Sequence, residues 1–254
     1  MKPVALRAAG LTDTGSVREH NEDAFLVAGN LLVVADGMGG HRAGEVAARI
    51  CVEELGALFE PAEGPRPWWR FWGPGLGGQA RLADALRRAN RAIFDASRGA
   101  PEHQGMGTTV VALWRDGPTL HYAHVGDSRL YRLRDGTLTQ LTADHSLLER
   151  CKRAGLVDAA DDADFPYKNV IVRALGLQPG VIVDAASTPV APGDRYLLCS
   201  DGLTDLLDGR TIQARLAADA SPSEVALGLV QDALEAGGVD NVTVVVAHLE
   251  PGEP

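Results

Sequence analysis

The sequence predicts an α+β fold, a four-layer αββα sandwich in which two antiparallel sheets pack face to face and helices cover their outer sides. Three observations lead to this prediction. Strand-forming and helix-forming runs occur in separate blocks rather than in regular alternation. Several strand runs are joined by tight turns, which make neighbouring strands antiparallel. The helix-forming runs are apolar on one face only, so each is expected to cover one side of a sheet.

Short apolar runs bounded by turn residues predict the strands. Gly29-Asn30, Asp116-Gly117 and Asp135-Gly136 are turns of the kind that joins two antiparallel strands. The predicted strands are residues 4–11, 24–28, 31–35, 108–114, 119–125, 129–133, 181–184, 195–199 and 242–249.

Three stretches have the apolar spacing of amphipathic helices. The first begins near Ala43, and the second is residues 79–97. The third begins at Ser221, which is expected to cap it, with Pro222 in the first position and Glu224 completing a capping box. Its apolar pattern ends at the glycine pair 237–238.

Length and charge restrict the classes of protein. A chain of 254 residues can form one domain with a full core, and residues 1–254 are expected to be a single catalytic domain. The net charge is -10 and no basic run occurs, so a nucleic-acid partner is not expected. Three cysteines without paired spacing, and no long apolar segment, predict a cytoplasmic protein that is neither exported nor membrane-spanning. A monomer is expected.

Two segments interrupt the pattern and are expected to be surface excursions. Residues 61–78 are rich in proline, glycine and tryptophan, and residues 155–168 contain an acidic run from Asp158 to Asp164. The tryptophans Trp68, Trp69 and Trp72 are expected either to pack onto the helices or to form an exposed anchor for a partner or a membrane surface.

Carboxylates recur at predicted strand ends. A single Asp-Gly after a strand is usually a turn, but several carboxylates brought to one edge would repel one another and require bound cations. Oxygen ligands without a histidine or cysteine cluster favour magnesium or manganese. We expect the glycines after Asp36 to let a backbone carbonyl approach the metal, and Gly44 to allow tight packing of the following helix. The carboxylates are Glu22, Asp23, Asp36, Asp127, Asp201 and Asp240.

These residues belong to a set of ordered motifs that resembles the bacterial branch of the type 2C (PPM) metal-dependent serine/threonine protein phosphatases. The resemblance extends from about residue 10 to residue 249, and the family's fold is the helix-flanked β-sandwich predicted above. The motifs are Arg18-x-x-Asn21-Glu22-Asp23, Asp36-Gly37-Met38-Gly39-Gly40-His41-x-x-Gly44-Glu45, Gly105-Met106-Gly107-Thr108-Thr109, Val125-Gly126-Asp127-Ser128-Arg129, Asp144-His145-Ser146, Ser200-Asp201-Gly202-Leu203 and Asp240-Asn241-x-Thr243.

The resemblance implies two or three Mn²⁺ or Mg²⁺ ions and a role for each motif residue. Asp36 would bridge two metals and be catalytic, and Arg18 would be the catalytic, phosphate-binding arginine. Two such metals would acidify a bridging water that attacks phosphorus in line. The remaining metal ligands would be Gly37 through its carbonyl, Asp201, Asp240 and, for a third metal, Asp127, while Glu22 and Asp23 would be outer-shell groups that hold metal-bound waters.

Some roles stay open. Arg18 could instead form a solvated surface ion pair, and Asp127 could belong only to a turn. Many eukaryotic members have a histidine, proposed to protonate the leaving alcohol, where this chain has Met38. Its substitute could be a metal-bound water, His41 or His145. Residues 146–175 correspond to the flap that overhangs the site in bacterial members.

The implied activity is metal-dependent hydrolysis of phosphoserine and phosphothreonine on proteins, opposing a bacterial serine/threonine kinase in signalling. The partners would be a phosphorylated protein substrate and a cognate kinase. The alternatives are a pseudophosphatase that binds phosphoproteins, a small-phosphoester hydrolase and a structural Ca²⁺ site. Each predicted metal carboxylate is present in the sequence, which favours the active enzyme.

Overall fold

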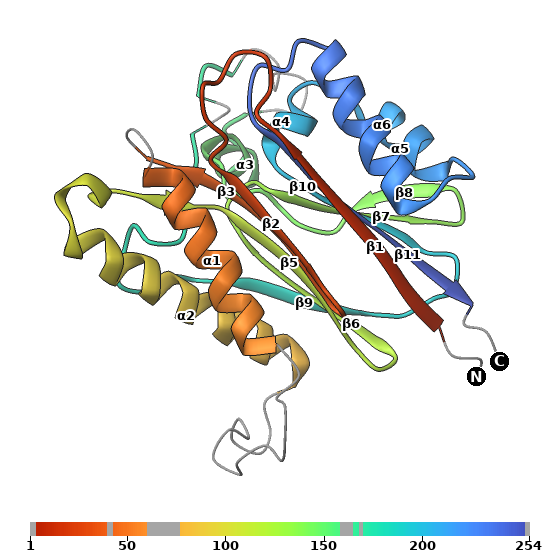
Figure 1. Cartoon of the computed structure of the whole chain (residues 1–254), viewed down its shortest axis with the longest axis horizontal. Helices are drawn as coiled ribbons and strands as arrows, with labels where there is room; N and C mark the ends of the chain where they lie inside the picture. The colour runs from red at the N-terminus through yellow and green to blue at the C-terminus, as the bar shows by residue number, and fades with distance from the viewer. Residues whose placement is uncertain (1–3, 40–42, 60–76, 158–164, 168–169, 252–254) are drawn as a thin grey trace.

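A computed structural model describes residues 4–39, 43–59, 77–157, 165–167 and 170–251. Two antiparallel sheets pack face to face, and helices cover both outer sides, so the predicted αββα sandwich is confirmed (Figure 1). One sheet has the strand order β1-β11-β10-β7-β8, and the other has β2-β3-β5-β6-β9 with β4 paired to β3. The strands are β1 (Val4–Asp13), β2 (Asp23–Ala28), β3 (Leu31–Met38), β4 (Gly107–Thr108), β5 (Val110–Asp116), β6 (Thr119–Val125), β7 (Arg129–Arg134), β8 (Thr137–Gln140), β9 (Asp184–Pro189), β10 (Arg195–Cys199) and β11 (Val242–Pro251).

Three apolar layers hold the sandwich together. Tyr196, Leu198 and Val245 belong to the buried layer between the two sheets. A second layer lies between the β2-β3-β5-β6-β9 sheet and the first two helices, and a third lies under the last two helices (Figure 1). The helices are α1 (Ala43–Phe59), α2 (Gly78–Gly99), the 3₁₀ turn η2 (Pro101–His103), α3 (Leu147–Arg153), α4 (Asp201–Thr204), α5 (Gly209–Ala217) and α6 (Pro222–Glu235).

The local signals for α6 and for the hairpins have the expected structural effect. Ser221 accepts a hydrogen bond from the backbone N–H of Glu224, and the Glu224 carboxylate accepts one from the N–H of Ser221, as a capping box requires. Gly29, Gly117 and Gly136 have positive φ in the β2–β3, β5–β6 and β7–β8 turns. These turns fix the register of each strand pair.

The prediction was wrong for the strand at residues 181–184. The strand there is β9, which begins at Asp184 and continues to Pro189. Its sequence, DAASTP, has no bulky apolar residue because β9 is an edge strand that pairs only with β6. The predicted strand 108–114 is divided into β4 and β5, the turn at residues 135–136 implied β8 without its bounds, and α3, α4 and α5 were not predicted.

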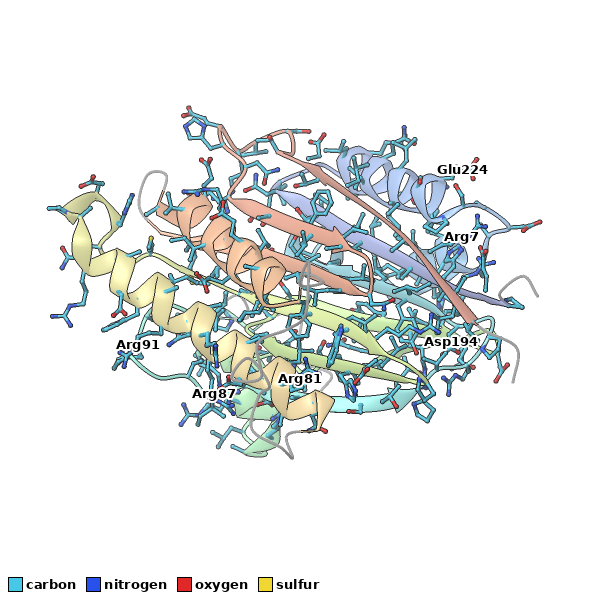
Figure 2. All side chains as sticks on the ribbon, turned by 60° about the horizontal axis from the view of Figure 1, so that its bottom comes forward. Arg7, Arg81, Arg87, Arg91, Asp194 and Glu224 are labelled. Atoms are coloured by element: carbon cyan, nitrogen blue, oxygen red, sulfur yellow. The ribbon has the colours of Figure 1, made fainter. Side chains whose placement is uncertain are left out.

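The base of the Trp-rich insert is visible at the end of α1 and the start of α2. Phe59, the last residue of α1, packs its ring edge-on against Trp114 with 4.9 Å between centroids. Near the start of α2, Arg81 lies over the same Trp114 ring, and Figure 2 shows Arg81 projecting from this helix. Residues 60–76 and the acidic run 158–164 lie outside the described residues.

Candidate metal centre

Asp36 lies where β3 leaves the sheet, and its main chain is held from both sides. The hydroxyl of Thr108 and the backbone N–H of Thr109 each donate to the Asp36 carbonyl at 2.8 Å. The Thr109 hydroxyl accepts from the Asp36 N–H at 3.3 Å. On the other side, Asp36 is the register partner of Asp23 at the start of β2. The strand pairing therefore places two carboxylates at one sheet end.

The second sheet brings Asp201 and Asp240 to the same place. Asp201 follows β10 and opens α4, whereas Asp240 precedes the neighbouring strand β11. Ser200 joins the two sheets here, because its hydroxyl donates to Asp23 Oδ2 at 2.8 Å and accepts from the N–H of Thr243 at 3.0 Å. The four carboxylates predicted from strand ends thus gather at one end of the sandwich.

The electrostatics of this cluster favour a bound cation. Burial, and after it four neighbouring carboxylates, hold the pKa of Asp36 well above its ordinary value. Burial also raises the pKa of Asp23 and of Asp201 to about 6, and each receives a further increase from nearby carboxylates. Burial is again the first cause of the raised pKa of Glu22. Ionised carboxylates at this density are stabilised by a divalent cation with oxygen ligands.

Asp127 gives a more direct indication of a missing charge partner. It lies in the β6–β7 connection with 8% of its surface exposed, and its Oδ1 is buried without any hydrogen-bond partner. Burial raises its pKa to about 7, and Asp201 is the largest charged contributor. A buried carboxylate oxygen without a donor is rare in proteins, and a cation satisfies it. The donor set therefore fits Mn²⁺ or Mg²⁺.

The glycines serve packing at this end of β3. A Cβ at Gly37 would overlap the Gly44 carbonyl and lie 2.5 Å from the Glu22 carbonyl oxygen. A Cβ at Gly44 would lie 2.7 Å from the Gly37 carbonyl carbon. The expected tight packing of α1 at Gly44 is confirmed, and the same contact explains Gly37 without a metal. Ligation by the Gly37 carbonyl stays a prediction.

Arg18 lies beside the cluster on the loop between β1 and β2. Its Nη2 donates to Asp240 Oδ2 at 2.7 Å, and 55% of its side chain is exposed. The hydrogen bond that Arg18 donates to Asp240 is the main cause of its raised pKa. The ion pair with Asp240 joins residues 222 apart in sequence and is partly exposed, so both the phosphate-binding role and the alternative of a solvated surface ion pair stay predictions.

Asn241 ties the Arg18 loop to the cluster. Its Nδ2 donates to the carbonyls of Thr14 and His20 at 2.9 Å, and its Oδ1 accepts from the N–H of Glu22 at 2.9 Å. The side-chain amide thus holds both ends of the loop that carries Arg18, directly after Asp240. Asn241 was predicted only as part of a motif, and the positioning contacts of Asn241, Ser200 and Thr109 were not predicted from the sequence.

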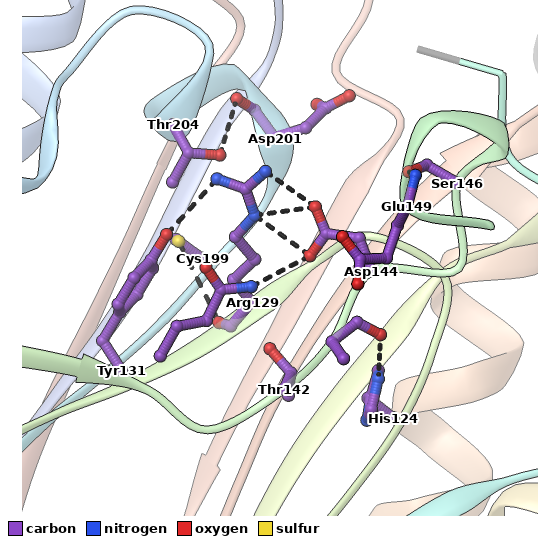
Figure 3. A network of polar contacts seen from close by, with 12 residues as sticks. His124, Arg129, Tyr131, Thr142, Asp144, Ser146, Glu149, Cys199, Asp201 and Thr204 are labelled. Atoms are coloured by element: carbon purple, nitrogen blue, oxygen red, sulfur yellow. Dashed lines mark hydrogen bonds and ion pairs between the residues drawn. The ribbon is translucent and has the colours of Figure 1, made fainter. Parts of the chain in front are cut away.

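Arg129 and Asp144 connect the Asp127 turn to the following chain. The Arg129 guanidinium donates to the Asp144 carboxylate through Nε and Nη2, the shortest distance being 2.7 Å (Figure 3). Gln140 adds a further hydrogen bond to Asp144 at 3.0 Å. This ion pair places the next residue, His145, behind the turn.

His145 is not suited to be the general acid. It is 4% exposed, and contacts occupy both ring nitrogens, Gly126 N–H at Nδ1 and Arg173 and Asp184 at Nε2. Burial lowers its pKa to about 4, so it has no proton to donate near neutral pH beyond the one it uses structurally. Met38 ends β3, and His41 lies outside the described residues.

The fold and this end of the sandwich define a protein in which two packed sheets bring buried carboxylates together. The protein phosphatase 2C family matches residues 15–235, so the chain belongs to that family. Among the described residues, no helix is long and apolar enough to cross a membrane.

Relatives and solved structures agree with this assignment. The chain is 39% identical over 249 residues to the serine/threonine protein phosphatase PstP of Mycobacterium tuberculosis, covering 97% of this chain and 45% of that protein. It is 37% identical to the serine/threonine phosphatase stp of Listeria welshimeri, covering 93% of each chain. The chain thus spans less than half the length of PstP but nearly all of stp.

Two crystal structures of PstP superpose on nearly the whole chain. The M. tuberculosis structure has a TM-score of 0.87 at 40% identity and covers 97% of this chain and 99% of that one. The PstP catalytic domain in complex with 2 manganese ions has a TM-score of 0.84 at 38% identity, with the same coverage.

Proposed function

We propose that this chain hydrolyses phosphoserine and phosphothreonine esters on proteins with the help of Mn²⁺ or Mg²⁺. The observation that carries the proposal is the group of carboxylates with raised pKa values at one sandwich end, next to one exposed arginine. The relatives named as serine/threonine phosphatases, and the manganese complex of PstP, support the same activity.

The residues would divide the work as follows. Asp36, Asp201, Asp240 and the Gly37 carbonyl would hold two cations, and Asp127 would help to hold a third. When bound, the cations acidify a water for in-line attack on phosphorus and neutralise charge on the phosphate oxygens. Glu22 and Asp23 would fix waters at the edge of the site.

Arg18 would bind the phosphate group. Its side chain is half exposed and Asp240 contacts it at Nη2, which supports access of a phosphate group to the guanidinium. A planar guanidinium suits two phosphate oxygens at once. His145 would take no part in proton transfer, because its Nδ1 accepts from Gly126 and its Nε2 lies against Asp184.

The partners proposed are a phosphorylated protein and the kinase that phosphorylates it, in the cytoplasm. Free cysteines support a reducing compartment, since Cys51 and Cys199 are buried and unpaired. A binding-only pseudophosphatase is less well supported, because its metal site would lack a ligand, whereas each predicted carboxylate is present and gathered here.

The test is hydrolysis of a phosphothreonine peptide after chelation and readdition of metals. Mn²⁺ or Mg²⁺ should restore activity, and Ca²⁺ should not, because its loose, high-coordinate geometry acidifies water poorly. Equal turnover with and without divalent ions would contradict the metal mechanism. Faster turnover of a small phosphoester than of any phosphopeptide, in kcat/KM, would favour the small-phosphoester alternative.

A further inference from the structure

A polar network lies behind the Asp127 turn and takes no part in the proposed chemistry. It consists of His124, His145, Arg173 and Asp184, which come from β6, the chain after β8, the end of the flap region and β9. Both histidines are 4% exposed, and their rings stack with 4.6 Å between centroids. Buried polar groups of this kind are costly unless all their hydrogen bonds are made.

The hydrogen bonds fix the tautomer of His145. The backbone N–H of Gly126 donates to its Nδ1 at 3.0 Å, so Nδ1 must be the unprotonated nitrogen. Nε2 therefore carries the proton and lies 3.3 Å from Asp184 Oδ2, and its 2.9 Å contact with Arg173 Nη1, also a donor, is not a hydrogen bond. Arg173 cannot accept a hydrogen bond, and its Nη1 donates to Asp184 Oδ1 at 2.8 Å. Asp184 thus accepts a hydrogen bond from Arg173 and lies against the N–H group of His145.

The network is already balanced in charge without a metal. Ligand atoms of His124, His145 and Asp184 lie within 4.8 Å of one another, a spacing that a transition metal could use. The Arg173 guanidinium, however, lies 2.9 Å from His145 Nε2 and pairs with the same carboxylate. A cation there would have to displace another cation, so a positioning role explains the network better than a second metal site.

His145 forms hydrogen bonds to Gly126 through both its side chain and its main chain. Besides the contact at Nδ1, the His145 N–H donates to the Gly126 carbonyl at 2.9 Å. Gly126 has φ +106, and a Cβ there would lie 2.5 Å from the Thr109 side chain, so the turn has one close-packed conformation. The next residue is Asp127, whose buried Oδ1 has no partner.

On its other side His145 holds the end of the flap region. Its carbonyl accepts from the N–H of Val172 at 2.8 Å, one residue before Arg173. Ser146 continues the contact through a bridge to Ile171. One residue thus touches both the turn that precedes the unpartnered carboxylate and the chain that returns from the flap region.

We propose that His145 is a positioning residue that orients the Asp127 carboxylate for binding a cation. Through Asp184 and Arg173, His145 would also connect the orientation of Asp127 to the end of the flap region. The contacts themselves are independent of the activity, but the importance of the Asp127 cation rests on the proposed function. Partners that orient a ligand typically change metal affinity by about 10- to 100-fold when removed.

A pair of substitutions separates the two sides of the imidazole. His145→Asn keeps an acceptor near the position of Nδ1 and loses the Asp184 side, whereas His145→Gln keeps a donor near Nε2 and loses the Gly126 contact. The measurement is calorimetric titration of the metal-free protein with MnCl₂, with Asp127→Ala defining the site that depends on Asp127. His124→Gln is the matched control, because it can still donate to the Ala143 carbonyl that His124 contacts at 2.9 Å.

The expected result is that His145→Gln weakens the Asp127-dependent Mn²⁺ site about tenfold or more. His145→Asn, which loses only the Asp184 side, should weaken the same site about threefold, as Asp184→Asn should, whereas His124→Gln should leave it unchanged, and the tighter sites should not change in any variant. Unaltered binding in His145→Gln, equal loss in both His145 variants, or no Mn²⁺ site that depends on Asp127 would overturn the proposal.

A further variant keeps the test decisive if the His145 variants do not fold. Asp184→Asn preserves size and removes the charge shared by His145 and Arg173, and it should weaken the same site about threefold or more. Unchanged binding there would overturn the link to Arg173. The Mn²⁺-binding measurement is separate from the activity assay. If Mn²⁺ binding does not change as expected but phosphopeptides are hydrolysed, only the role of His145 is refuted. If the His145 variants change Mn²⁺ binding as expected but the protein hydrolyses no phosphopeptide, only the proposed function is refuted.

Discussion

Strand β10 has an aspartate just outside each of its ends, and the two residues have opposite surroundings. Asp194 is 2% exposed and accepts from Arg134 Nε at 2.7 Å, Arg134 Nη2 at 2.6 Å and the Tyr196 hydroxyl at 2.9 Å. Asp201 lies among other carboxylates, and burial followed by those charges raises its pKa to about 6. The protein supplies the compensating charge for Asp194, whereas Asp201 must obtain it from a ligand.

The same contrast separates the two ends of the sandwich. Asp194 lies near the end where β1 begins and β11 ends, and Figure 2 shows it on that side of the molecule. At the other end, Asp36 and Asp127 have carboxylates as charged neighbours, and Asp127 Oδ1 has no partner. Burial of an aspartate is therefore not itself a sign of function. The missing countercharge is the sign.

The largest effect is expected for Asp36→Asn. The substitution keeps the shape of the side chain and removes its charge, so hydrolysis under saturating Mn²⁺ should fall about 10³-fold or more, equivalent to about 4 kcal/mol of transition-state stabilisation. Circular dichroism should show an unchanged fold. Activity above a few per cent of the original would mean that the cations bind elsewhere.

Asp194→Asn should have the reverse profile. It leaves Arg134 without its buried partner, so the free energy of unfolding should fall by about 3 kcal/mol, toward the low end for a broken buried pair because Arg134 is partly exposed. Urea denaturation measures the loss, with metal-free Asp201→Asn as the matched control that should not lose stability. A change of more than about twofold in kcat/KM for a small phosphoester would argue against the separation of the two ends.

Metal-free protein should become more stable as the pH falls from 8 to 5. Burial, the largest cause, raises the pKa of Asp127 to about 7 and of Asp201 to about 6 in the folded state, whereas about 3.9 is ordinary for an unfolded chain. The protonated forms of Asp127 and Asp201 therefore stabilise the folded state fully below the pKa of an unfolded aspartate. This stabilisation is lost as the pH rises through the folded-state pKa values of about 6 and about 7. A gain on the order of 2 kcal/mol at pH 5 is expected from thermal unfolding.

Mn²⁺ should remove or invert this pH dependence, because metal binding requires ionised carboxylates. Asp194→Asn should leave the dependence in place, since that residue lies at the other end. A metal-free unfolding temperature that rises between pH 5 and 8 would contradict the raised pKa values.

A smaller effect on catalysis is expected for a substitution of Asn241, which lies at the same end of the sandwich as Asp36. Asn241→Ala frees the Arg18 loop and should lower kcat/KM for a phosphopeptide about tenfold, mainly through KM. In an Arg18→Ala background the same change should cost little, which gives a coupling energy of about 1.4 kcal/mol. If the losses in kcat/KM from the two substitutions add in the double variant, Asn241 acts independently of Arg18. The affinity for Mn²⁺ is measured as a control, because it would fall if the substitution disturbed the neighbouring Asp240.

Much of the fold could be predicted because the buried strands and amphipathic helices carry periodic apolar patterns. The elements that were missed lack that signal. β8 is a polar edge strand, TLTQ, and β9 is an edge strand whose pairing with β6 decides its bounds. The short helix α5 is capped by Asp208, which accepts from the Thr211 N–H, and this cue was present in the sequence.

The site was predictable to the extent that its carboxylates follow or precede strands. Asp36, Asp201 and Asp240 could be found in this way, because strand ends meet at a sheet edge. The groups that hold their backbone could not, since Ser200, Asn241 and His145 form contacts with residues brought near only by the packing of the two sheets. Local sequence carries no signal for such pairs.

The smallest effect on catalysis is expected from the Trp-rich insert. The chain enters it after Phe59, whose ring contacts Trp114, and Trp114 is the register partner of Leu31 at the opposite end of β3 from Asp36. Asp36 is five positions along the strand from Leu31, which is roughly 16 Å. Replacing Trp68, Trp69 and Trp72 by serine should therefore leave kcat/KM for a small phosphoester within about twofold.

The same variant decides between the two hypotheses for the insert. If the tryptophans pack onto the helices, truncating even one of them costs about 3 to 5 kcal/mol, and the unfolding temperature must fall clearly. If they form an anchor, stability is unchanged and only binding to a partner or a membrane surface is lost. A loss of small-phosphoester hydrolysis without a loss of stability fits neither hypothesis, and it would show that the two ends of the sandwich are coupled.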